Sequence, residues 1–251
     1  MKPSTLLNSF LYLVLALICV TSIGCGPNFG EKVDFNETEI FYKGGVTKQD
    51  AERLGEKLTA MKFVDGKRKS VQLLKRDDVW EFRMAIGKGG DSKGLRNQMK
   101  FYCMELSSAF DGDPVEVHIC NSKLESQSVI KGLSGKRYQY ENSDKDTIYF
   151  YQDIDLDNVK SFAAIASGAQ LDPGNSVFHL SKSGDVIEIR MACLDAIKAS
   201  KHIKMAAADA AIAASNRLFD GKQVDVLICD PFFDSPDVYS SVTKTEPPAA
   251  P

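Results

Sequence analysis

The sequence predicts an α+β protein of two tandem units, each with the ferredoxin-like element order β-α-β-β-α-β and an antiparallel sheet. Two repeated segments support this prediction. The segment VWEFRM at 79–84 returns as VIEIRM at 186–191, and FDGDPVEVHIC at 110–120 returns as FDGKQVDVLIC at 219–229. The offsets are 107 and 109 residues and the order is kept, which indicates that one unit of the chain has been duplicated.

The first unit shows strand and helix patterns in that order. A helix begins at Thr47, where Asp50 completes a capping box, and its apolar residues recur every three or four positions. A second helix begins near Ser92 and ends at Asp111-Gly112. Four segments have the residue pattern of strands: 39–42, 71–74, 79–86 and 115–119.

The second unit repeats this order. Its first helix begins near Asp155, which we expect to cap it, and an alanine-rich helix follows from about Lys198 to Phe219. The expected strands are 148–151, 177–180, 186–191 and 224–229. Right-handed crossovers then place both helices of a unit on one face of its sheet.

Composition divides the chain into six parts. Segments rich in Ser, Lys, Gly and Asn read as linkers, and the Pro-rich end cannot bury enough apolar surface to become ordered. The predicted parts are a signal peptide at 1–24, a tether at 25–37, a first unit at 38–122, a linker at 123–145, a second unit at 146–233 and a disordered tail at 234–251.

The N-terminal segment differs from the rest of the chain. Lys2 precedes the apolar run Phe10–Val20, which is shorter than the roughly 20 residues of a membrane span and fits the core of a signal peptide. The sequence Ser22-Ile23-Gly24-Cys25 then resembles the lipobox of bacterial lipoproteins, with Ser22 where that family usually has Leu. The resemblance implies that cleavage leaves Cys25 as a lipidated N-terminus that carries palmitate.

This resemblance predicts a location as well. We expect a protein anchored by lipid to a membrane of the cell envelope, facing the periplasm or the exterior. Ordinary cleavage after the small residues Ser22 and Gly24 would instead give a secreted protein. Residues 38–233 resemble the duplicated modules of uncharacterised bacterial lipoproteins.

Charge and cysteine content narrow the function further. The formal net charge is -3, and no run of Lys or Arg could follow a phosphate backbone, so we expect no nucleic-acid partner. Cys103, Cys120, Cys193 and Cys229 allow three sets of disulfide pairs, and four buried thiols are the alternative.

Two features suggest an enzyme, and each has a simpler interpretation. The G-x-S-x-G segment at 90–94 has the spacing of a nucleophile elbow, yet glycines separate it from the strand, so Asp91 or Ser92 more plainly caps a helix. His118 and Cys120 share a strand face and could bind a metal.

The second unit reproduces neither feature. Leu227 stands at the position of His118, and Leu73 in the first unit answers His179, so no histidine is duplicated. We therefore expect no catalytic residue, no metal and no cofactor. A small hydrolase using Ser92, or a metal-dependent enzyme using His118 and Cys120, is the alternative.

One charged pair is duplicated, since Glu81 and Arg83 return as Glu188 and Arg190. These residues form either a polar patch on the open sheet face or an ion pair between strands that fixes the register. Tyr149 and Tyr151 make the second sheet the less polar of the two. The six residues form the predicted binding surface, and we expect an envelope protein or a ligand to bind at a sheet face or in the cleft between the units.

Overall fold

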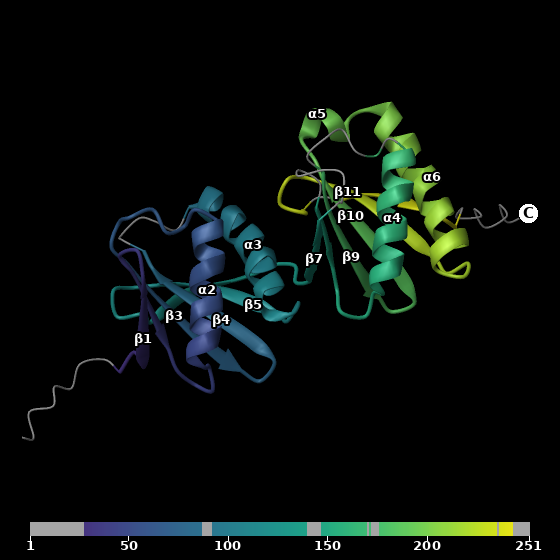
Figure 1. The fold of residues 1–251 in the computed structure, drawn as a ribbon. Helices are drawn as coiled ribbons and strands as arrows, with labels where there is room; N and C mark the ends of the chain where they lie inside the picture. Colours follow the sequence, from purple (N-terminus) through teal and green to yellow (C-terminus); the bar gives the residue numbers. More distant parts are fainter. Residues whose placement is uncertain are drawn as a thin grey trace, which may run out of the picture.

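The computed structural model describes residues 28–86, 92–139, 147–169, 171, 176–234 and 236–242. These residues form an α+β protein with two tandem units, each a six-stranded sheet with helices over one face (Figure 1). The first unit lies near the N-terminal end of the described chain, and the second carries the C-terminal end on its far side. The predicted signal peptide and Cys25 lie outside the described residues.

The first unit contains one sheet, in which the strands follow chain order from β1 to β6. Its strands are β1 (Glu31–Phe35), β2 (Thr38–Tyr42), β3 (Lys69–Arg76), β4 (Val79–Ala85), β5 (Val115–Cys120) and β6 (Ser126–Lys131). Its helices are α2 (Lys48–Ala60), α3 (Lys93–Ser107) and the 3-10 turn η1 (Ser108–Phe110).

The second unit has the same strand order, from β7 to β12. Its strands are β7 (Lys136–Gln139), β8 (Thr147–Phe150), β9 (Val177–Ser183), β10 (Val186–Ala192), β11 (Val224–Cys229) and β12 (Asp237–Ser240). Its helices are α4 (Leu156–Gly168), α5 (Asp195–Lys198) and α6 (Lys201–Leu218), so the alanine-rich helix expected from about Lys198 to Phe219 is confirmed as α6, and the short helix α5 precedes it.

Strand pairing corrects the predicted topology. In the first sheet β2 pairs with β3 and β4 with β5 in parallel, whereas the other neighbours are antiparallel. The second sheet alternates in the same way. Both sheets are therefore mixed and not antiparallel, and their sequential strand order differs from the interleaved order of a ferredoxin-like fold.

The assumption of right-handed crossovers explains the error. Two right-handed crossovers with both helices on one face require the interleaved, antiparallel order. Here β4 runs antiparallel to β2, the sheet grows in one direction through β3 to β5, and α2 and α3 contribute to a single core on one face. The two crossovers of the unit therefore have opposite hands, which the sequence pattern does not reveal.

Side-chain alternation places the core between the helices and the sheet. Trp80 and Phe82 of β4 are buried with Leu54 of α2 and Leu106 of α3. In the second unit the alternate residues of β10 lie in the core with α4 and α6. Removing this apolar surface from water stabilises each unit, and it leaves the opposite sheet faces to form other contacts.

Local sequence determines where the helices begin. Thr47 and Asp50 form the expected capping box, and the Ser92 hydroxyl accepts the N–H of Leu95 at 3.2 Å. Asp155 caps α4 by accepting the N–H of Asp157 at 2.7 Å. The interpretation of Ser92 as a helix cap is confirmed, while Asp91 lies outside the described residues.

Both units extend beyond their predicted bounds, because each sheet has an additional strand at either edge. Strand β1 lies in the segment expected to be a tether, β6 and β7 lie in the expected linker, and β12 lies in the expected tail. Only residues 132–135 separate the last strand of the first sheet from the first strand of the second. The connection between the two sheets is therefore only four residues long.

Candidate binding site between the two units

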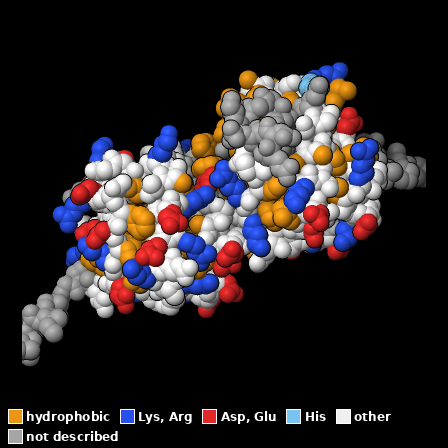
Figure 2. Space-filling view, viewed as in Figure 1, with side chains coloured by type: hydrophobic (Ala, Val, Ile, Leu, Met, Phe, Trp, Pro, Cys, Tyr) orange, Lys and Arg blue, Asp and Glu red, His pale blue; other side chains and the backbone are white. Residues whose placement is uncertain are grey.

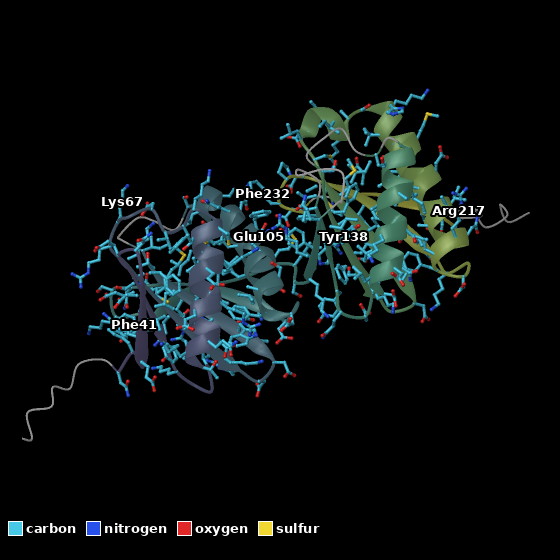
Figure 3. The ribbon with its side chains drawn as sticks, in the orientation of Figure 1. Phe41, Lys67, Glu105, Tyr138, Arg217 and Phe232 are labelled. Carbon is cyan, nitrogen blue, oxygen red and sulfur yellow. The ribbon has the colours of Figure 1, made fainter. Side chains whose placement is uncertain are left out.

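The open face of the second sheet meets helix α3 of the first unit. Met104 of α3 is buried against Tyr149, Leu227, Cys229 and Phe233 of the second unit. Figure 3 shows Glu105 and Phe232 near this junction, and Arg217 far from it. Tyr149 was predicted to lie on an open binding face. In the structure the first unit covers this part of the face, so Tyr149 is buried.

A hydrogen-bonded chain crosses the junction. The Tyr149 hydroxyl donates to Oε1 of Glu105, and Nζ of Lys57 donates to Oε2 of the same carboxylate. Burial, followed by the charge of Glu105, holds the pKa of Tyr149 well above its ordinary value. Tyr149 thus stays protonated and serves as a donor that joins β8 to α3.

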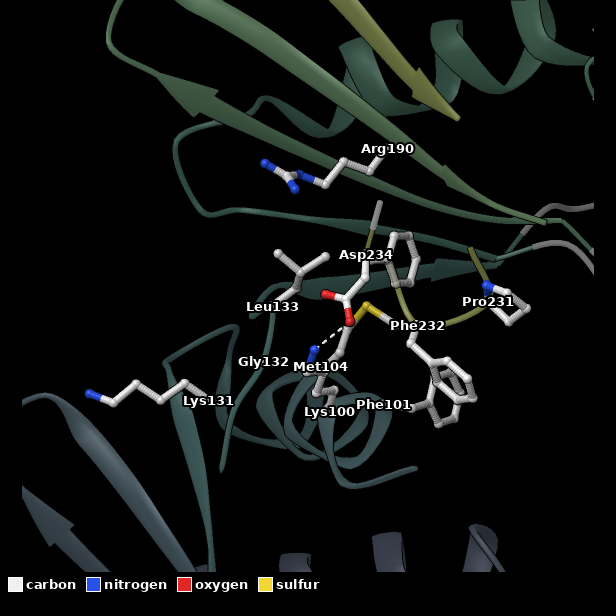
Figure 4. A pocket seen from close by; sticks show the side chains of 11 residues that line it. Lys100, Phe101, Met104, Lys131, Gly132, Leu133, Arg190, Pro231, Phe232 and Asp234 are labelled. Atoms are coloured by element: carbon white, nitrogen blue, oxygen red, sulfur yellow. Dashed lines mark hydrogen bonds and ion pairs between the residues drawn. The ribbon is translucent and has the colours of Figure 1, made fainter. Parts of the chain in front are cut away.

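A pocket of about 260 Å³ lies beside this contact, and we name it the junction pocket (Figure 4). Four segments surround it: α3, the connection after β6, strand β10 and the loop after β11. The lining residues are Lys100, Phe101, Met104, Lys131, Gly132, Leu133, Arg190, Pro231, Phe232, Phe233 and Asp234.

Glycine allows the connection to approach the helix. A Cβ at Gly132 would lie 2.5 Å from the carbonyl oxygen of Lys100, too close for any other residue at this backbone position. Across the pocket, Nζ of Lys100 donates to the carboxylate of Asp234, as the dashed line in Figure 4 shows. This ion pair joins α3 of the first unit to the loop of the second.

Asp230 shapes the loop that forms the far wall. Its Oδ1 accepts the N–H groups of Phe232 and Asp234, both at 2.9 Å, and Phe233 has a left-handed φ of 62°. This arrangement turns the side chain of Phe233 inward, where its ring lies 6.4 Å from that of His179.

The first unit contains the same loop at the same offset. Oδ1 of Asn121 accepts the N–H groups of Lys123 at 2.9 Å and Glu125 at 3.1 Å, and Leu124 has a φ of 58°. Leu124 is buried over the open face of the first sheet. The two loops differ in their side chains, because Lys123 stands where the second unit has Phe232.

The two repeated arginines differ in how fully they are bonded. Arg83 donates from Nε and Nη2 to Glu81 at 3.1 and 2.7 Å, and from Nη1 to the Leu124 carbonyl at 3.4 Å. Within the described residues, Arg190 donates only from Nη2 to Glu188, and its buried Nε has no partner. Both pairs lie along a single strand, at i and i+2, and not between strands as expected.

Each arginine also has a histidine on a neighbouring strand. For Arg83 this is the strand that follows in the sheet, and for Arg190 it is the strand that precedes. Strand register places Gln72 and His118 next to Arg83, and His179 and Leu227 next to Arg190. Gln72, and not Leu73, is therefore the counterpart of His179. Nε2 of His179 donates to the Ser134 carbonyl at 2.8 Å, and burial lowers the pKa of His179 to about 4.

Much of the open face of the first sheet is covered. Glu81, Gln72 and His118 are buried there, under Leu124 and the N-terminal residues around Phe29, whose carbonyl accepts from Gln72 at 2.7 Å. Figure 2 views the first unit from the side of α2 and α3, where acidic and basic side chains are intermixed. The predicted surface at Glu81 and Arg83 is thus an internal ion pair of the first unit.

The residues considered for an enzyme have structural contacts. Nδ1 of His118 lies 3.0 Å from the Ser126 hydroxyl, and burial raises the pKa of Cys120 to about 11. No three of the His, Cys, Asp and Glu residues in the described ranges gather to hold a metal ion. Cys103, Cys120, Cys193 and Cys229 are free, buried thiols in this structure.

A second hollow, of about 560 Å³, lies between α4 and α6. Small side chains such as Ala164, Gly168 and Ala213 line most of it, with Asp209 and Arg217 among the charged residues. Its volume is larger than that of the junction pocket, and all of its lining residues belong to the second unit.

Of the six residues predicted as a binding surface, Arg190 alone lines the junction pocket. Tyr149 lies in the neighbouring contact, Glu188 pairs with Arg190, and Tyr151 follows β8, where its N–H donates to Leu180. The sequence prediction missed the residues from α3 and the loop 231–234. The aromatic pair at 232–233, set against Lys123-Leu124 at the same offset, was the available signal.

Comparison with known proteins gives one family match. Residues 32–131 match a family model described as a family N-terminal domain. This range runs from β1 to the end of β6, so it covers nearly all of the first sheet and less than half of the chain. The chain matches no curated protein and no solved structure. Among the described residues, no helix has the length and apolar character needed to cross a membrane.

Proposed function

We propose that this chain is a lipid-anchored protein of the cell envelope that binds a small ligand in the junction pocket. The pocket is the observation that carries the proposal, since both units line it and Arg190 bonds through only one of its donors within the described residues. The lipobox-like segment ending at Cys25 supports the anchor. Sites formed between structural units are common places for ligands in proteins.

The internal repeat also supports a binding site at this position. In the first unit, Arg83 uses three of its five donors, two to Glu81 and one to the Leu124 carbonyl. In the second unit, Arg190 uses one donor within the described residues, and it lines the junction pocket together with Phe232 and Phe233. Donors that are bonded at the first arginine and unbonded at its repeat favour a ligand at the second one.

Native mass spectrometry of the full chain, purified from its membrane, tests this proposal. We expect a small molecule to remain bound to the wild-type chain and to be lost from Leu133→Trp, which fills the pocket. Leu194→Trp is the matched control, because Leu194 is exposed on the second unit outside the pocket. Equal retention by Leu133→Trp, or none by the wild type, would contradict binding in the pocket.

The anchor has its own test. Incorporation of labelled palmitate should occur in the wild type and disappear in Cys25→Ala. Labelling that persists in Cys25→Ala would contradict lipidation at Cys25, and it would leave the pocket unaffected.

A further inference from the structure

We infer that the ligand of the junction pocket is a small organic carboxylate with an apolar body, about the size of one aromatic ring or a short acyl chain. This inference rests on the proposed function, because it names the ligand class of the same site. Size, wall chemistry and the surroundings of Arg190 lead to it separately.

Size limits the ligand first. A volume of about 260 Å³ corresponds to roughly nine water molecules at about 30 Å³ each, so the occupant has on the order of ten non-hydrogen atoms. A sugar of this size would need many hydrogen-bonding groups around it. In the junction pocket four charged side chains provide such groups, and Phe101, Met104, Leu133, Phe232 and other apolar residues form the rest of the lining.

The walls favour an apolar body. Phe101 and Met104 lie on the side of α3 that faces away from its own core, and Phe232 comes from the opposite unit. Aromatic rings and a flexible thioether adapt well to a flat ring or a short chain. Burying such a body between the two units releases water from apolar surface on both sides.

The charges of the lining favour an anionic end. Lys100, Lys131 and Arg190 line the pocket, against one carboxylate, that of Asp234. Lys100 bonds Asp234, and Lys131 bonds Glu116 at 2.7 Å, while Glu116 and Glu188 themselves lie outside the lining. The cations are therefore nearer to a bound molecule than most of their partners are.

Arg190 is the group that would hold the carboxylate. Arginine has five N–H donors, and Arg190 uses one of them in the described structure. The Leu124 carbonyl that accepts from Nη1 of Arg83 has no bonded equivalent at Arg190. A carboxylate would supply the missing acceptor, and a charge-assisted hydrogen bond is stronger than one to a neutral group.

Calorimetric titration of the full chain tests this inference with two acids and their neutral analogues. The probes are phenylacetate and hexanoate, each compared with its amide, which keeps the shape and loses the charge. We expect at least one acid to bind the wild-type chain, with its amide binding more than about tenfold more weakly. This comparison requires no variant.

Variants then test the role of Arg190. Arg190→Gln should lose acid binding about tenfold or more, and Arg190→Lys should lose less, because it keeps the charge without the planar fork. Arg217→Gln is the matched control, since Arg217 lines the other hollow, and its affinity should be unchanged. Circular dichroism of each variant checks that it is folded.

The outcomes separate this inference from the proposed function. Amides that bind as well as acids, acids that fail to bind, or an Arg190→Gln variant that is folded and binds normally would each overturn the carboxylate assignment. If a molecule still co-purifies with the chain and is lost from Leu133→Trp, the proposed function stands and only the ligand class is wrong. If nothing co-purifies and neither acid binds, both fail.

Discussion

Arg83 and Arg190 occupy matched positions of a repeated motif, and their surroundings give them different properties. Glu81, the partner of Arg83, is 3% exposed and also forms an ion pair with Nη2 of Arg76 at 2.8 Å. Glu188, the partner of Arg190, is 21% exposed, and in the part of the chain that the structure describes it bonds Arg190 alone. The same two residue types therefore form a buried network in one unit and a partly solvated pair in the other.

Glu81→Gln should destabilise the protein more than Glu188→Gln does. Loss of a buried carboxylate leaves Arg83 without its counter-charge, and breaking such a pair costs about 3 kcal/mol. The partly solvated pair in the second unit contributes about 1 kcal/mol or less. Urea denaturation of both variants measures the difference, and equal free energies of unfolding would show that burial of Glu81 adds nothing.

His179 should make stability depend on pH. Burial lowers its pKa from the ordinary 6.5 to about 4; the charge of Arg190 acts in the same direction, and the Ser134 carbonyl and Glu188 act against it. Between these values the unfolded chain binds a proton that the folded chain does not. Stability is therefore full above pH 6.5 and falls as the pH drops toward 4, by up to about 1.4 kcal/mol per pH unit.

His179→Gln places at this position the residue that the first unit has, Gln72. The glutamine side chain cannot titrate. The free energy of unfolding of the variant should therefore change less with pH between 6.5 and 5 than that of the wild type. Denaturation at several pH values measures the two slopes. Parallel slopes would mean that His179 titrates equally in the folded and unfolded chains.

Among the elements, helix starts were predictable and edge strands were not. The caps at Thr47, Ser92 and Asp155 depend on residues three or fewer positions away, so the local sequence determines them. Strands such as β7 (KRYQ) and β12 (DVYS) are short and polar, and they form because a neighbouring strand offers free hydrogen-bonding groups. Their existence depends on the sheet and not on their own sequence.

Only part of the pocket lining was predictable from the sequence, because most of the lining depends on contacts between distant segments. Arg190 was identified because it belongs to a repeated motif, whereas Lys100, Phe101 and Phe232 belong to segments far apart in the chain. These side chains come together only when α3 packs on the second sheet. No periodicity within one element reports a contact between two units.

The loop after β11 should control binding separately from stability. Asp230→Ala removes the acceptor of two backbone N–H groups, and Asn121→Ala removes the matching acceptor in the first unit. We expect each variant to lose about 1 kcal/mol of stability, by analogy with the loss of a helix cap. Only Asp230→Ala should weaken binding of the acid probe, because only its loop lines the pocket. Equal affinity of both variants for the acid probe would show that the loop after β11 does not contribute to binding.

For the molecule as a whole, the junction determines whether the two units unfold together. Met104 lies on α3 of the first unit and is buried against the second unit, so Met104→Asp places a charge in that contact. The single tryptophan, Trp80, reports on the first unit, while far-ultraviolet circular dichroism reports on both. The wild type should give coincident transitions by the two probes, and Met104→Asp should separate them, because each unit keeps its own core.

Met205→Asp is the control for this experiment, because Met205 is 59% exposed on α6 and the change should leave the transitions coincident. Met104→Asp should also lose the acid probe, since Met104 lines the junction pocket. Binding and coupled unfolding would then depend on the same contact, as expected if the ligand joins the two units. Coincident transitions in Met104→Asp, with the acid probe still bound, would mean that the contact at Met104 neither couples the units nor forms the pocket.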